Sequence, residues 1–118
     1  MTLWELFKRG TIEVPIPLTA DWRTDVQTDV KAYRSGDVVT VVAWRLAVNA
    51  GVTGSVDAYT LPPGFRPPPL FTDRTTDSRG AAVALGVSGT VQVTNPATAV
   101  SHHSFTFVTR DAMPTGGA

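Results

Sequence analysis

The residues best suited to chemistry in this chain are two adjacent histidines, His102 and His103. Imidazole is a common ligand of transition metals and a common general base. Neighbouring residues of a strand point to opposite faces, however, so the pair cannot hold one ion without a bulge. Neither an acidic residue nor a third histidine lies nearby. We therefore expect no metal site, and we assign both histidines to polar surface or to a subunit interface.

Catalysis by a nucleophile or by a carboxylate pair is equally weakly supported. Ser101, His102 and one of several aspartates could form a triad, but almost any chain offers such a set. The sequence has no G-x-S-x-G elbow, no nucleotide-type glycine loop and no H-E-x-x-H. Its only glutamates are Glu5 and Glu13, so a glycosidase pair would need dispersed aspartates. We predict a protein that is not an enzyme and has no cofactor.

Aromatic side chains could instead form a stacking platform for a sugar or for single-stranded nucleic acid; the candidates are Trp22, Tyr33, Trp44 and Tyr59. Trp44 stands on the most apolar face of the most hydrophobic strand pattern, so we assign it to the core. Tyr33 and Tyr59 come at predicted strand ends beside loops. They are the candidate saccharide contacts.

Composition limits the partners. The 118 residues include ten basic and ten acidic ones, which gives a formal net charge of zero, and no cysteine. Because neither sign of charge forms a block, we expect no binding to nucleic acid or to a membrane surface. The lack of cysteine excludes disulfides and thiolate metal sites. The length predicts one domain, and neither a membrane span nor a signal peptide is evident, which favours a protein made in a cytoplasm.

Alternating apolar residues predict a β-rich domain. The strongest strand pattern is Asp37 to Val48, where apolar residues at odd and even positions predict burial of both faces of the first half. Residues 81–87 and 90–94 predict a hairpin that turns at Ser88-Gly89. Residues 73–80, which include no apolar side chain, predict a polar loop. Seven to nine short strands are expected in total, which is typical of an antiparallel β-sandwich or barrel.

Five prolines fall within residues 60–69, which read TLPPGFRPPP. Proline fixes φ and lacks a backbone donor, so this run cannot be an interior strand. A Pro-Gly turn signal lies between the apolar Leu61 and Phe65, and the guanidinium of Arg66 can bind strand-end carbonyls or a carboxylate. We expect a rigid corner that joins two layers of the domain.

The first 18 residues are expected to form an extended N-terminal arm, ahead of a β-barrel domain at 19–110 and a flexible tail at 111–118. Residues 3 and 7 suit one or two helical turns that need a surface to lie on. The prolines within residues 11–18 favour an edge strand or an extended arm. Either this terminus packs on its own domain, or it docks on a partner chain. The residues assigned to attachment are Leu3, Trp4, Leu6, Phe7, Ile12, Val14 and Ile16.

The order of features between residues 29 and 94 is similar to a known module. A strand ends at Gly36-Asp37, and the long apolar strand, a short strand, the LPPGFRPP segment and a G-T-V-x-V hairpin at 89–93 follow. This order resembles the small β-barrel domains of tailed-bacteriophage virion proteins, in which tLPxGfRP and G-x-v-x-v segments recur. The structural signature of that family falls here on Leu61, Pro62, Gly64, Phe65, Arg66 and Pro67.

The resemblance implies a non-enzymatic homotrimer that displays loops outward, either as a capsid decoration protein or as a tail-fibre or baseplate tip domain. Tip domains end long fibre proteins, whereas this sequence carries little N-terminal shaft. We therefore expect a virion decoration protein, assembled in the host cytoplasm, whose arm binds the major capsid protein lattice or another virion protein. The alternative is a tail receptor-binding module that recognises host cell-wall saccharide through loops near Tyr33, Tyr59 and residues 73–80.

Overall fold

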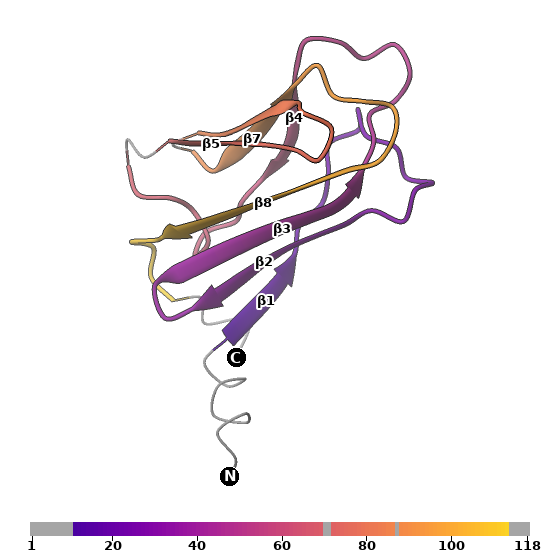
Figure 1. The fold of residues 1–118 in the computed structure, drawn as a ribbon. Coiled ribbons are helices and arrows are strands. Elements are labelled where there is room, and N and C mark those ends of the chain that lie inside the picture. Colours follow the sequence, from indigo (N-terminus) through magenta and orange to yellow (C-terminus); the bar gives the residue numbers. More distant parts are fainter. Residues whose placement is uncertain (1–10, 70–71, 87, 114–118) are drawn as a thin grey trace.

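The computed structural model describes residues 11–69, 72–86 and 88–113. These residues form eight strands, which make two four-stranded antiparallel sheets packed face to face (Figure 1). The all-β sandwich expected from the alternating pattern is therefore confirmed. No helix in the described part of the chain is long and apolar enough to cross a membrane.

The first sheet has the strand order β1-β2-β3-β8 and the second has the order β4-β7-β6-β5. The strands are β1 (Thr11–Pro15), β2 (Asp29–Ser35), β3 (Val38–Leu46), β4 (Ser55–Thr60), β5 (Asp73–Thr76), β6 (Ala82–Leu85), β7 (Thr90–Thr94) and β8 (Ser101–Val108). Four strands, β1, β8, β4 and β5, are therefore sheet edges.

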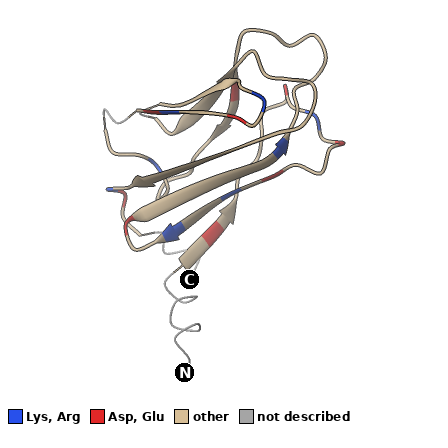
Figure 2. Cartoon of the chain, viewed as in Figure 1, with Lys and Arg blue, Asp and Glu red and all other residues tan. Residues whose placement is uncertain are grey.

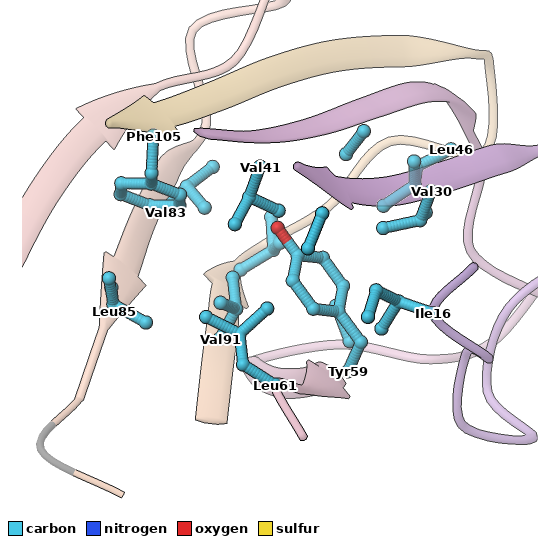
Figure 3. Packing of buried hydrophobic residues seen from close by; sticks show 14 of the residues in the cluster. Ile16, Val30, Val41, Leu46, Tyr59, Leu61, Val83, Leu85, Val91 and Phe105 are labelled. Carbon is cyan, nitrogen blue, oxygen red and sulfur yellow. The ribbon is translucent and has the colours of Figure 1, made fainter. Parts of the chain in front are cut away.

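The hydrophobic core lies between the two sheets. From β3 it receives Val39, Val41 and Ala43, all fully buried. The second sheet contributes its own alternate residues, and Figure 3 shows the ring of Tyr59 lying between the layers, close to Val41. Because side chains alternate along each strand, one face of each sheet supplies most of the core, and connecting segments add Trp22, Leu61 and Phe65.

β3 buries one face only, which corrects the expectation that both faces of its first half are covered. Val38, Val42 and Trp44 point away from the core and are 45%, 37% and 52% exposed. Trp44 is therefore a surface residue, and its assignment to the core is wrong. A valine-rich strand usually implies two covered faces, but only one face of the first sheet meets the second sheet.

Residues 73–76 form the edge strand β5 where the sequence predicts a polar loop. None of its four side chains is buried, so the alternation of residue types that identifies a strand is missing. Backbone pairing with β6 holds it instead. The predicted hairpin is confirmed as β6 and β7, with Gly89 at φ 85° in its turn.

The proline-rich segment connects β4 to β5, which are the opposite edges of one sheet. It therefore crosses the end of that sheet, and the prediction that it joins the two layers is wrong. Its apolar residues Leu61 and Phe65 are each 1% exposed, and Gly64 has φ 95°, as a turn between two anchors requires.

Arg34 of β2 fixes this crossing to the first sheet. Its side chain is only 2% exposed and lies on the inward face of the strand. The guanidinium donates to the carbonyls of Gly36 at 2.8 Å, Gly64 at 2.7 Å and Ala112 at 3.0 Å. One buried cation thus holds together the turn after β2, the crossing and the residues after β8.

Asp111 makes a second connection to the same crossing. Its carboxylate accepts hydrogen bonds from the N–H groups of Gly64 and Arg66 at 2.9 and 3.1 Å and from Nε of Arg66 at 3.1 Å. Burial alone would raise the pKa of Asp111, but the hydrogen bonds from Arg66 and Gly64 outweigh it and hold that pKa below its usual value. The carboxylate partner anticipated for Arg66 is therefore present.

Candidate binding surface

The outer face of the first sheet carries an apolar strip, which we define as Val38, Val42 and Val108. Val38 and Val108 are direct partners across β3 and β8. Between them and Val42 lie Thr40 and Thr106, whose hydroxyls are 3.3 Å apart. All three valines are exposed, and Val108 is 59% exposed. Adjoining apolar side chains on a surface mark an interaction site more often than single ones do.

An aromatic pair, Trp44 and His102, stands at the other end of the same face. The two rings are stacked, with centroids 4.0 Å apart and planes inclined by 17°. Nδ1 of His102 accepts a hydrogen bond of 3.1 Å from the backbone N–H of Arg45. In neutral His102 the proton is therefore on Nε2, and the ring is held in place beneath one face of the indole.

The backbone under this pair is irregular. The pairing of β3 with β8 shifts register between Ala43 and Leu46, and Arg45 has φ 61°. Three hydrogen bonds hold this bulge: the bond to His102, a bond from Nε of Arg45 to the Val26 carbonyl, and one from the Thr28 hydroxyl to the Arg45 carbonyl. β-Bulges re-aim side chains, and a non-glycine residue with positive φ is costly unless its surroundings fix it.

Charged residues line the side of the aromatic pair that faces β2. Asp29 is the β2 partner of Trp44 in the sheet. Nζ of Lys31 lies 3.6 Å from the Asp29 carboxylate and 3.0 Å from that of Glu13. The hydrogen bond that Lys31 donates to Glu13 and the charges of both carboxylates raise the pKa of Lys31. The β2 side of Trp44 therefore offers both hydrogen-bond donors and acceptors, and its two carboxylates outnumber the one ammonium group.

Three of the four sheet edges are protected against pairing with another chain. Pro15 ends β1, where its missing N–H weakens the edge. The β4 edge is covered, since Thr19 donates to the Asp57 and Ala58 carbonyls at 2.7 and 2.9 Å, and Nε1 of Trp22 donates to Asp57 at 3.1 Å. β5 has only four residues, two of them charged. Short, charged or covered edges resist association.

The β8 edge is protected only in part. The N–H of His102 donates to the Ser78 hydroxyl, and its carbonyl accepts from the Ser78 N–H, both at 3.0 Å, so Ser78 covers the edge at His102. β5 of the other sheet also approaches β8. By alternation the backbone groups of Ser104, Thr106 and Val108 point away from β3 in the same way. β8 contains no proline, Lys, Arg, Asp or Glu (Figure 2).

The residues predicted to attach the arm fall into two groups. Leu3, Trp4, Leu6 and Phe7 lie outside the described residues. Ile12 and Val14 are partly buried and pack against the core, and Ile16 is 5% exposed. β1 is the predicted edge strand. Its apolar side chains thus contact the protein's own core and are not offered to a partner in this structure.

The two tyrosines predicted as saccharide contacts are separated. Tyr33 is partly buried on the outer face of the first sheet, between Glu13 and Thr40. Tyr59 is 1% exposed, and its hydroxyl lies 2.8 Å from Nε2 of His103 inside the sandwich. Burial raises the pKa of the Tyr59 phenol. Tyr59 is therefore a core residue and cannot contact a ligand at the surface of this structure.

The two histidines point to opposite faces, as their adjacency predicts. His102 lies outside against Trp44, and His103 lies inside against Tyr59. Burial lowers the pKa of His103 to about 4, although the charge of Asp77 opposes this shift. Within the described ranges no three His, Cys, Asp or Glu side chains come together as a metal site.

Sequence reasoning missed two features of this surface. The exposure of Trp44 was missed because both faces of β3 carry apolar residues, and no residue pattern indicated the bulge at Arg45 that fixes His102. Arg34 was identifiable, because it shares the inward face of β2 with Val30 and Ala32, where a cation needs partners.

The chain was compared with models of protein families, with curated proteins and with solved structures, and none of the three comparisons gave a match.

Proposed function

We propose that this chain is a non-enzymatic structural protein of a tailed-bacteriophage virion, a capsid decoration protein that assembles as a homotrimer on the lattice of the major capsid protein. The phage assignment rests on the resemblance of the LPPGFRP segment and of the strand order around it. The assembly role rests on one structural observation, the uncharged and only partly covered β8 edge beside the apolar strip.

The physical case for assembly is that a single chain leaves the valines of the strip exposed and some backbone groups of the β8 edge without a strand partner among the described residues. Val38 and Val108 adjoin each other on the strip, and the backbone groups of Thr106 at the neighbouring edge point outward. An uncharged edge strand next to exposed valines readily pairs with another chain. A closed ring of copies would cover such a surface in every protomer, and attachment through several arms would raise the avidity for a capsid.

The corner that carries the resemblance is built as a structural element. Leu61 and Phe65 are buried, and the polar groups around Gly64 and Arg66 bind Arg34 and Asp111. This supports the view that the segment shapes the module and does not itself bind a ligand.

Sedimentation equilibrium of the purified protein tests the assembly. We expect a trimer whose dissociation is strongly promoted by Thr106→Lys, which places a charge on the β8 edge. Thr76→Lys, at an exposed position on the protected β5 edge, is the matched control and should leave the trimer intact. A monomeric wild-type protein at micromolar concentration would refute the proposal of a homotrimer.

Deletion of residues 1–10 tests the capsid role separately. The shortened chain should keep the trimer and its circular dichroism spectrum but lose binding to capsids in a co-sedimentation assay. Binding that survives the deletion would exclude attachment through Leu3, Trp4, Leu6 and Phe7. The number of copies per virion gives an independent check, because decoration of a lattice needs hundreds.

The second candidate function is a tail module that binds host cell-wall saccharide. The observation that favours it is the exposed aromatic pair on the first sheet, and a virion with only a few dozen copies at the tail would support it over the capsid role.

A further inference from the structure

The Trp44–His102 pair is neither part of the core nor part of the apolar strip. It lies at the end of β3 where the chain leaves the strand, whereas Val38 and Val108 lie where β3 begins (Figure 1). Half of the Trp44 surface is exposed, and His102 covers one face of the indole. Because His102 belongs to β8, the opposite face of the indole is on the β2 side of Trp44. Asp29 of β2 is the partner of Trp44 in the sheet.

The backbone beside the pair is fixed by several hydrogen bonds. Arg45 adopts φ 61°, and its backbone N–H orients His102. Two further hydrogen bonds, to Val26 and from Thr28, fix the same residue. The bulge also brings Leu46 into the core, so it serves the fold as well as the surface. At the surface it leaves the indole of Trp44 stacked on a ring that is already held in place, and a preorganised aromatic face loses little freedom when a ligand binds.

The chemistry around the free indole face fits a neutral sugar. A pyranose offers one face of C–H groups, which can stack on an aromatic ring, and a rim of hydroxyls that are both donors and acceptors. Asp29 can accept from such hydroxyls and Lys31 can donate to them. Lys31 is already paired with Asp29 and Glu13, and the two carboxylates on the β2 side of Trp44 would repel a phosphate or a nucleic acid backbone.

We propose that the outer face of the first sheet carries a saccharide-binding site in which a neutral sugar ring stacks on Trp44, with His102 supporting the indole from behind and Asp29 and Lys31 bonding the hydroxyls. The site does not depend on the capsid role, and it would supply the recognition that the tail alternative requires. It replaces the buried Tyr59 as the aromatic contact.

The test uses the purified full-length protein and a glycan array that includes neutral hexose and N-acetylhexosamine oligomers. Binding hits are then measured by NMR titration with the free oligosaccharide. We expect at least one neutral oligosaccharide to bind and to shift the indole N–H signal of Trp44, which Trp44→Ala identifies. The shift reports on the site and does not depend on the assembly state.

Trp44→Ala should weaken this binding about tenfold or more, as the loss of one stacked ring predicts, and Trp44→Phe should weaken it less. His102→Ala removes the ring stacked on the indole, and its saccharide affinity should lie between those of Trp44→Ala and Trp44→Phe. Thr76→Ala, an exposed change on β5, is the control and should bind like the wild type.

Three results would overturn the inference. One is an array without any neutral saccharide bound by the wild-type protein. Another is equal affinity in Trp44→Ala and wild type. The third is sedimentation that shows dissociation of the oligomer in Trp44→Ala, because Trp44 would then lie between subunits. Loss of saccharide binding would leave the capsid co-sedimentation result unchanged, so the two proposals can fail separately.

Discussion

The Tyr59 hydroxyl and Nε2 of His103 are 2.8 Å apart in the middle of the sandwich, one from each sheet. The two rings are nearly parallel, with planes inclined by 6°, and the edge of His103 also meets Phe105. The pair is the polar link between the layers. It satisfies two groups that would otherwise be buried without partners.

This link predicts a stability that depends on pH. Histidine in the unfolded chain has a pKa of about 6.5, whereas burial lowers the pKa of His103 in the folded protein to about 4. Between these values the unfolded state binds more protons, so the free energy of unfolding rises with pH and falls on acidification. The loss between pH 7 and pH 4 should be about 3 kcal/mol from this one residue. Urea unfolding at pH 5, 6 and 7 measures the upper part of that loss.

His103→Gln is the informative variant, since glutamine keeps a hydrogen-bond partner for Tyr59 but does not titrate in this range. Its unfolding free energy should depend less on pH than that of the wild type between pH 5 and 7. Equal pH dependence in the two proteins would mean that other groups cause it.

Arg34→Met is predicted to be strongly destabilising. It leaves the buried carbonyl of Gly64 and the partly buried carbonyls of Gly36 and Ala112 without the donor that binds them. An unsatisfied buried group costs about 1 to 3 kcal/mol, so a loss of at least this size is expected in urea unfolding from Gly64 alone. Arg74→Met, on the exposed face of β5, should change stability by less than about 0.5 kcal/mol. A similar small change for Arg34 would contradict its role at the crossing.

Asp111→Asn should lower the free energy of unfolding by about 1 to 3 kcal/mol, because it replaces the charged carboxylate that accepts hydrogen bonds from Gly64 and Arg66 at the same crossing. Since the pKa of this carboxyl is lowered in the folded state, its contribution is full above the unfolded pKa and is lost as the pH falls through the folded one. Thermal unfolding at pH 7 and pH 3 should therefore show a larger difference between variant and wild type at pH 7. Asp21→Asn, an exposed change, serves as the control.

Two glycines separate backbone strain from crowding. Gly54 and Gly89 have similar positive φ, 80° and 85°, but a Cβ at Gly54 would meet nothing within 4 Å. At Gly89 it would lie 3.2 Å from Cγ of Arg66 and 3.4 Å from Cβ of Leu61. Gly54→Ala should cost about 1 kcal/mol from φ alone, and Gly89→Ala about 1 to 3 kcal/mol more from overpacking against the crossing. Equal melting temperatures of Gly54→Ala and Gly89→Ala would show that the proline-rich crossing shifts to accommodate the added Cβ at little cost.

The strands that the sequence could predict are those whose inward residues contrast with their outward ones. The β6–β7 hairpin is of this kind, with Val83, Leu85, Val91 and Val93 inside and a glycine at the turn. β5 has no such contrast, since none of its side chains is buried and backbone pairing with β6 holds it. β3 was predicted as a strand, but valines occupy both of its faces, so the sequence did not show which face is inward. Period-2 patterns locate strands but do not tell which apolar face meets the other sheet.

The candidate site was less accessible to sequence reasoning than the fold. Trp44 reaches the surface by the same alternation that exposes Val38 and Val42, but the sequence does not tell which face of β3 is outward. The bulge at Arg45, which fixes His102 against Trp44, depends on Val26 and Thr28, which are separated along the chain and carry no local signal. The burial of Tyr59 could not be predicted, because its hydroxyl needs a hydrogen-bond partner inside the core, and that partner, His103, belongs to the other sheet. Of the two partners expected for Arg66, strand-end carbonyls or a carboxylate, the structure has the carboxylate of Asp111, but the connection of this segment across one sheet follows only from strand order.

The hydrogen-bond partners of Arg34 lie far apart in the sequence, which affects when the domain can fold during synthesis. β3 has no neighbour on one side until β8 has been synthesised, and Arg34 obtains its last carbonyl from Ala112, 78 residues further along. A nascent chain therefore holds an unfinished sheet, and Arg34 lacks one of its carbonyl partners, until residue 112 has left the ribosome. We infer that this domain folds only after that point, slowly for its size, as topologies dominated by distant contacts do.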